Sequence, residues 1–244
     1  MIYFPSRTLE GDPRAIGLEF KDVTLKTSDN LKLHGWFVPA KNERAVVLLC
    51  HGNAGNISNR LSIIRLLHGL KFSVFIFDYR GFGRSEGSPD EDGTYLDAEA
   101  AWKHLTEERG IPDKHIVVLG RSLGGAIASH LAAIHTPGVL IVDSSFTSLP
   151  DIGQEAYPIM PVSLLSRYDY PTRENVKKVR CPVLVIHSQG DEVIPFHHGR
   201  EIFETAPQPK RFLEVSGGHN DNFAVSSKTY GDGIVAFIDR HIPK

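Results

Sequence analysis

The sequence predicts an α/β fold built on a mostly parallel, doubly wound β-sheet. Short continuous apolar runs recur along the chain, and helix-length amphipathic stretches separate them. Continuous apolar runs are typical of parallel strands that helices cover on both faces. A regular alternation of strand and helix favours one such sheet. The predicted parallel strands are Ala45–Cys50, Ser73–Phe77, His115–Leu119, Val139–Val142, Val183–His187 and Arg211–Val215.

The other elements follow from periodicity. Between Leu31 and Val38 the pattern alternates until Pro39, which predicts antiparallel strands at the N-terminal side of the sheet. Helical periodicity follows most of the apolar runs and returns at the end of the chain. The predicted helices are Asn59–His68, Tyr95–Arg109, Leu123–His135 and Tyr230–His241.

The domain organisation is expected to be simple. No internal repeat or linker interrupts the series, so we expect residues 1–244 to form a single domain. Residues 149–180 lack a strand signal and contain four prolines, and we interpret them as a short cap insertion. Ligands of doubly wound sheets bind outside the carboxyl ends of the strands. The chemistry should therefore follow directly after the apolar runs.

Composition excludes several classes of protein. The chain is 41% hydrophobic and 23% charged with a net charge of −2, so nothing favours nucleic acid or an anionic membrane as partner. No segment is long and apolar enough to span a bilayer, and the first residues do not resemble a signal peptide. We therefore expect a cytoplasmic protein, with Cys50 and Cys181 as buried free thiols and no zinc or disulfide framework. The oligomeric state is left open.

One motif carries a nucleophile. Gly120-Arg121-Ser122-Leu123-Gly124 follows a predicted strand directly and opens a predicted helix. A serine on such a sharp strand-to-helix turn presents its hydroxyl to the cleft, and the glycines leave room for the backbone. The alternative is a glycine-rich turn with an incidental serine. The context favours Ser122 as a nucleophile.

A serine nucleophile needs a base and a group that orients the base. Asp191 and His219 each come four residues after an apolar run, on glycine-containing loops, and in the chain order Ser, Asp, His. We predict that His219 accepts the Ser122 proton and that Asp191 fixes the imidazole tautomer. Asp191 as a helix cap, Asp143 as a rival acid and His219 as a solvated loop residue are the alternatives. His34, His51 and His187 are expected to be structural.

An oxyanion hole is predicted from a second loop. The glycine-rich stretch after Cys50 can supply a backbone N–H from Asn53, or less favourably from Ala54, beside the N–H of Leu123. We expect His51 to support this loop. The stretch that begins at Asp78 lacks a phosphate-loop pattern and is interpreted as a structural turn, in which Tyr79 or Arg80 supports the oxyanion loop.

Taken in order, these motifs resemble the α/β-hydrolase superfamily over nearly the whole chain. HGNAGN, DYRGFGRSEG and GRSLGG are similar to a branch of lidless esterases and depalmitoylating thioesterases. The resemblance implies hydrolysis of a small-molecule acyl ester or thioester through an acyl-enzyme, with Ser122, His219 and Asp191 as the triad and without metal or organic cofactor. Some relatives carry an N-terminal membrane anchor, so membrane association is expected only if such a segment was trimmed.

The sequence leaves three points open. A peptidase or amidase with the same triad, and a non-catalytic binding protein on this fold, are the alternative functions. Apolar residues of the insertion either line an acyl groove or pack locally. These residues are Tyr157, Ile159, Met160, Leu164 and Leu165. Acyl chain length and the preference between ester and thioester cannot be read from the sequence.

Overall fold

The computed structural model describes residues 2–242, apart from the side chains of Ser163 and Leu164. Its main feature is an eight-stranded sheet in the order β10-β9-β8-β7-β4-β6-β3-β2. Neighbouring strands are parallel except at β2–β3 and β3–β6. The strands are β2 Lys21–Lys26, β3 Lys32–Val38, β4 Val46–Cys50, β6 Ser73–Phe77, β7 Ile116–Arg121, β8 Val139–Asp143, β9 Val183–Ser188 and β10 Lys210–Val215.

The predicted fold class is therefore confirmed. Each of the six apolar runs forms a parallel strand, shifted by at most two residues at either end. The two antiparallel strands lie at the N-terminal edge, as the alternating pattern predicts. A separate two-stranded pair joins β1 (Phe4–Pro5) to β5 (Ala54–Gly55), and this pair holds the start of the chain against the loop after β4.

Helices connect the strands and cover both faces of the sheet. The described α-helices are α1 Leu61–Gly69, α2 Glu91–Lys103, α3 Leu123–Ile134, α4 Leu149–Ala156, α5 Val162–Leu165, α6 Thr172–Val176, α7 Phe196–Thr205, α8 Asn222–Val225 and α9 Ser227–His241. Helix α2 begins before the predicted Tyr95 because the Asp90 side chain caps it by accepting from the Gly93 N–H. A π-helical turn, His104–Glu108, extends it. No described helix is long and apolar enough to cross a membrane.

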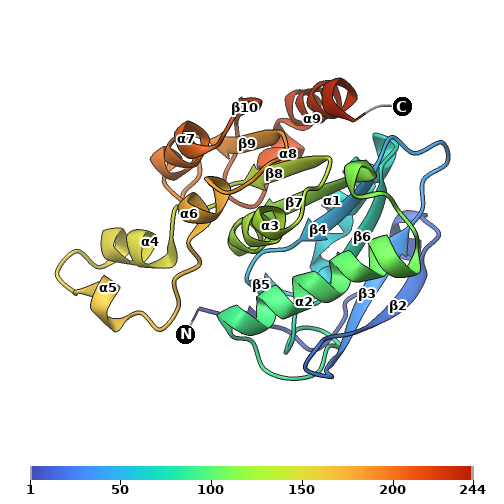
Figure 1. Cartoon of the computed structure of the whole chain (residues 1–244), viewed down its shortest axis with the longest axis horizontal. Helices are drawn as coiled ribbons and strands as arrows, with labels where there is room; N and C mark the ends of the chain where they lie inside the picture. Colours follow the sequence, from blue (N-terminus) through green and yellow to red (C-terminus); the bar gives the residue numbers. More distant parts are fainter. Residues whose placement is uncertain (1, 243–244) are drawn as a thin grey trace.

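The core has two halves, one on each face of the sheet (Figure 1). Because successive side chains of a strand point to opposite faces, β4 serves both. Val46 and Leu48 pack in the half formed with α2, α3 and α7, whereas Val47 and Leu49 pack in the half formed with α1 and α9. The strands are consequently buried on both faces, which explains why their sequences are continuously apolar.

The predicted cap insertion, residues 149–180, contains helices as its regular secondary structure. They contain α4, α5 and α6 between β8 and β9, and α4 with α5 projects from the side of the sheet (Figure 1). Cys50 and Cys181 are free and buried, in agreement with the prediction.

Candidate active site

Ser122 lies at the turn between β7 and α3, at the carboxyl edge of the sheet. Its backbone has φ 54° and ψ −123°, a conformation that non-glycine residues rarely adopt. Such a conformation costs roughly 1–3 kcal/mol and persists only where surrounding contacts hold it. Here the Ser122 N–H donates to the Asp143 carbonyl at 3.0 Å, and the Ser122 carbonyl accepts from the Gly125 N–H at 2.8 Å and from the Ser145 hydroxyl at 2.9 Å.

The glycines of the motif permit a close approach of backbone segments. A Cβ at Gly124 would lie 2.1 Å from the Cys50 carbonyl oxygen, and a Cβ at Gly120 would lie 2.1 Å from the Gly124 carbonyl oxygen. Helix α3 therefore begins in direct contact with the end of β4. This contact places the first residue of α3 next to the predicted oxyanion loop.

His219 and Asp191 meet as the sequence predicts. The His219 ring lies with Nδ1 at 2.9 Å from Asp191 Oδ2 and 3.1 Å from Asp191 Oδ1. Both residues are more than 90% buried. Asp191 comes from the loop after β9, and His219 comes from the loop after β10, so adjacent parallel strands bring the two loops together.

Asp191 is held as a carboxylate. Burial raises its pKa, but hydrogen bonds from the His219 ring and from the N–H groups of Ile194 and Val193 more than offset burial and hold the pKa below its ordinary value. These amides precede α7, which begins at Phe196, so Asp191 does not cap that helix. A charged Asp191 at Nδ1 stabilises the tautomer that leaves His219 Nε2 free to accept a proton.

The backbone of His219 is fixed from two sides. Its N–H donates to Glu192 Oε2 at 2.9 Å, and its carbonyl accepts from Arg121 Nη2 at 2.8 Å. Arg121 precedes Ser122 in the chain, so one guanidinium ties the loop of the histidine to the turn of the serine. It also donates to Asn222 Oδ1 at 3.0 Å.

Asp143, the rival acid, has a different role in the structure. Its fully buried carboxylate forms an ion pair with Arg121 (2.8 Å) and accepts hydrogen bonds from Tyr230, Asn222 and Ser144. Its hydrogen-bonding capacity is thus used within the protein, whereas Asp191 contacts the candidate base directly. The geometry favours Asp191 over Asp143 as the orienting acid.

His51 and Tyr79 support the loop after β4, as predicted. The Tyr79 hydroxyl donates to the His51 carbonyl at 2.9 Å, and the two rings lie 4.4 Å apart. Burial lowers the pKa of His51 to about 3, so the ring is neutral. Arg80 instead binds Asp97 and Asp29, away from this loop.

The two residues predicted to supply the oxyanion donors, Asn53 and Leu123, line the same cavity as Ser122. Leu123 is the first residue of α3, so its N–H has no acceptor within the helix. The Asn53 side chain donates to the Ile2 carbonyl at 2.7 Å, and the Asn53 carbonyl accepts from the Phe4 N–H at 2.9 Å. The N-terminal segment thereby fixes the loop that carries the Asn53 N–H.

A cavity of about 470 Å³ opens at this edge of the sheet. Ser122, His219, Asn53 and Leu123 all contribute to its lining. Among the hydrogen bonds of residues 2–242 there is none between Ser122 Oγ and His219, although both face the cavity. In free enzymes such catalytic hydrogen bonds are often long and tighten only when substrate binds.

Apolar side chains form most of the remaining wall. They come from the N-terminal segment, from the loop after β8 with the start of α4, and from the loop after Asp191. They are Ile2, Phe4, Phe146, Leu149, Ile152, Val193 and Ile194. Sequence analysis missed these residues, because only the fold brings their three segments to one edge.

Arg60 is a basic residue of the cavity that analysis of the sequence missed. Its guanidinium lines the cavity, where it contacts the Ala54 carbonyl. Burial, together with the nearby charge of Arg121, lowers its pKa. Among the described residues it has no carboxylate within ion-pair distance.

Four of the apolar residues of the insertion neither line the cavity nor pack closely against the domain, the two alternatives that the sequence left open. Tyr157, Ile159, Met160 and Leu165 are largely exposed, with Ile159 98% exposed, and the cavity is lined by the earlier Leu149 and Ile152 instead. The side chain of Leu164 lies outside the described part of the chain. Residues 157–165 follow α4 and include α5, in the segment that projects from the side of the sheet (Figure 1).

Comparison with known proteins identifies the family. Residues 45–159 match the family model of the alpha/beta hydrolase fold. The chain is 30% identical over 271 residues to the alpha/beta hydrolase domain-containing protein WAV2 of Arabidopsis thaliana, covering all of this chain and 88% of WAV2. This chain belongs to the alpha/beta hydrolase family. An uncharacterised protein of Mycobacterium tuberculosis is 36% identical over 241 residues, which cover 98% of this chain and 86% of that protein.

Solved structures share the fold at lower identity. An esterase from Pyrococcus furiosus superposes with a TM-score of 0.81 at 21% identity, over 99% of this chain and 98% of its own. The Butyrivibrio proteoclasticus protein Est1E, solved with ferulic acid, superposes with a TM-score of 0.73 at 18% identity, over 91% and 100%. At such identities the likeness concerns the fold.

Proposed function

We propose that this alpha/beta hydrolase is a serine esterase or thioesterase that works through an acyl-enzyme. One observation carries the proposal. A serine on a strained strand-to-helix turn shares a cavity with a histidine whose Nδ1 is hydrogen-bonded to a buried carboxylate. Nucleophile, base and orienting acid are the three roles that acyl transfer by a serine requires.

In the proposed mechanism, Ser122 Oγ attacks the acyl carbonyl while His219 Nε2 takes the hydroxyl proton. The N–H groups of Leu123 and Asn53 stabilise the oxyanion, and one such donor is typically worth about 10²–10³ in rate. His219 then gives the proton to the departing alkoxide or thiolate, and the acyl-enzyme forms. Water, deprotonated by His219, attacks the ester carbonyl, and the proton returns to Ser122 as the acid leaves.

The walls of the cavity support an acyl substrate. Apolar side chains such as Phe146, Leu149 and Ile152 line it, and each buried methylene of a bound chain contributes about 0.8 kcal/mol. The esterase names among the structural neighbours support this assignment.

Turnover of matched substrates tests the proposal. Esters, thioesters and amides that share one acyl group are to be compared with wild type and Ser122→Ala. We expect ester or thioester turnover in wild type, and a loss of about 10⁶ in kcat in the variant. Equal turnover by Ser122→Ala would exclude Ser122 as nucleophile, and a preference for the amide would favour a peptidase.

A further inference from the structure

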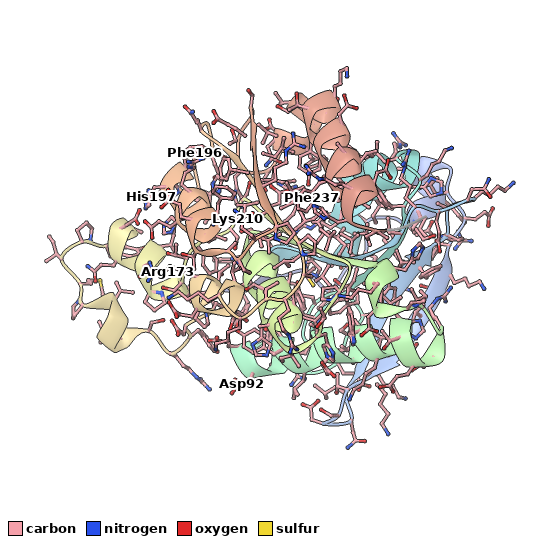
Figure 2. All side chains as sticks on the ribbon, turned by 45° about the horizontal axis from the view of Figure 1, so that its top comes forward. Asp92, Arg173, Phe196, His197, Lys210 and Phe237 are labelled. Atoms are coloured by element: carbon pink, nitrogen blue, oxygen red, sulfur yellow. The ribbon has the colours of Figure 1, made fainter. Side chains whose placement is uncertain are left out.

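A second cluster of reactive side chains lies outside the candidate active site, between the cap insertion and α7. A cavity of about 330 Å³ opens there, lined by Glu155 of α4 and by His197 and His198 of α7. Figure 2 shows His197 and Arg173 on the side of the molecule where α7 faces the α4–α5 unit. The proposed hydrolysis uses none of these residues.

Three potential ligand atoms converge in this cavity. The Nε2 atoms of His197 and His198 lie 2.9 Å and 3.2 Å from Glu155 Oε1, and all three ligand atoms lie within 4.8 Å of one another. Two ligands that each lie about 2.1 Å from a tetrahedral zinc ion are about 3.4 Å apart. Small side-chain shifts would therefore place all three atoms around one ion.

The hydrogen bonds of His198 hold its ring with Nε2 toward this point. The ring is 1% exposed, and its Nδ1 lies 2.9 Å from Thr147 Oγ1, which itself donates to Asp151 Oδ2 at 2.6 Å. The backbone N–H of Thr147 also lies 3.3 Å from Nδ1 and donates to it. Thr147 therefore fixes the ring through Nδ1, and Nε2 is the ring nitrogen that faces Glu155.

His198 Nε2 is left without a hydrogen bond. Although Glu155 Oε1 is 3.2 Å away, the contact does not have hydrogen-bond geometry, and this buried nitrogen has no hydrogen-bond partner in the described part of the chain. A buried ring nitrogen and a carboxylate oxygen therefore lie beside each other without a hydrogen bond between them. A cation bound to both atoms would give the buried nitrogen a partner.

The charges around the cavity fit a divalent ion. Asp151, Glu155 and Glu201 supply three carboxylates, and Arg173 supplies one guanidinium, which lies 3.1 Å from Glu201 and 3.8 Å from Asp151. Apart from the two histidines, the charged residues of the lining thus sum to −2. The side chains of Glu155 and His197 are half-exposed, so an ion can enter from solvent.

We propose that Glu155, His197 and His198 form a binding site for a divalent transition metal ion of the zinc type. Two imidazoles and one carboxylate suit zinc with water as fourth ligand, and the Thr147–Asp151 pair orients His198 as outer-shell groups typically do. The ion would join α4 to α7. Because Ile152, one turn before Glu155, lines the candidate active site, the ion would also stiffen one wall of that cavity.

Zinc titration of chelator-dialysed protein, in competition with a chromophoric chelator, tests the site. We expect wild type to bind one zinc ion per chain, and His197→Gln and Glu155→Gln each to weaken binding by about tenfold or more. His68→Gln, the same change on α1, is the matched control and should bind as wild type does. Millimolar magnesium or calcium should not compete, because these ions prefer all-oxygen sites.

Two results would overturn the proposal. The first is that wild type does not bind zinc stoichiometrically at a zinc concentration of about 100 μM. An affinity too weak for binding at this concentration is far below that of a structural zinc site. The other is stoichiometric binding with the same affinity in wild type, His197→Gln and Glu155→Gln, which would place the ion on other histidines. His198 is not substituted, since its ring is buried against Thr147.

Discussion

Replacing Asp191 by asparagine changes one atom at the centre of the candidate active site. Asp191 Oδ1 accepts from the N–H groups of Val193 (3.0 Å) and Ile194 (2.8 Å), and the asparagine oxygen can keep both bonds. The amide nitrogen then takes the place of Oδ2, 2.9 Å from His219 Nδ1. A donor at this position favours the tautomer with its proton on Nε2, which cannot accept the Ser122 proton.

The expected loss is large. A wrong tautomer and a missing carboxylate cost about 10⁴ in kcat in a serine protease, which corresponds to about 5.4 kcal/mol at 1.36 kcal/mol per factor of ten. The assay is ester or thioester hydrolysis at saturating substrate, with thermal unfolding as a check of folding. Glu192→Gln is the matched control, because Glu192 binds the backbone N–H of His219 and not the ring. We expect this control to stay within about tenfold of wild type.

The same variant has a pH signature. Since the pKa of Asp191 is lower in the folded protein than its ordinary 3.8, its charge contributes stability above pH 3.8 that is lost as pH falls through the folded pKa. The stability difference between wild type and Asp191→Asn should therefore shrink in acid. A folded Asp191→Asn with kcat within tenfold of wild type would refute the assigned role, and so would an equal loss in Glu192→Gln.

Three further predictions concern the surroundings of the site. Arg121→Met leaves the buried Asp143 carboxylate without its ion pair, so the free energy of unfolding measured in urea should fall by about 3–5 kcal/mol. A fall of less than about 1 kcal/mol would contradict the role of this pair. Ile152→Phe narrows the cavity, so kcat/KM for long-chain esters should fall by about tenfold relative to short-chain esters, and an unchanged chain-length profile would place the acyl group elsewhere. Burial raises the pKa of Asp78 from 3.8 to about 7, so wild type should lose stability relative to Asp78→Asn as pH rises from about 4 to about 7. Urea midpoints of the two proteins that change in parallel with pH would contradict this.

The sequence predicts the elements of the site that depend on local pattern. Ser122 was identifiable because its glycine-flanked motif adjoins a strand whose apolar run is unbroken. Asp191 and His219 were identifiable because parallel strands bring the loops at their carboxyl ends to one edge of the sheet. In the structure Asp191 contacts His219, and His219 and Ser122 line one cavity.

Contacts between distant segments could not be predicted in this way. Arg121 binds the carbonyl of His219, 98 residues away, and nothing in the local sequence marks this bond. The strand Phe4–Pro5 has only two residues, too few for periodicity to reveal it, yet it fixes the loop of Asn53. The sequence shows which residues of the insertion are apolar, but it does not predict that they are exposed. The pattern of a helix does not say which of its faces packs against the rest of the protein.

Intact-mass analysis after treatment with a fluorophosphonate tests the central claim most directly, because the probe reacts with a serine only where a base activates it. We predict a single adduct on wild type, mapped to Ser122, no adduct on Ser122→Ala, and slow labelling of Asp191→Asn. No adduct on folded wild type, or an adduct that persists in Ser122→Ala, would contradict the assignment of Ser122 as an activated nucleophile.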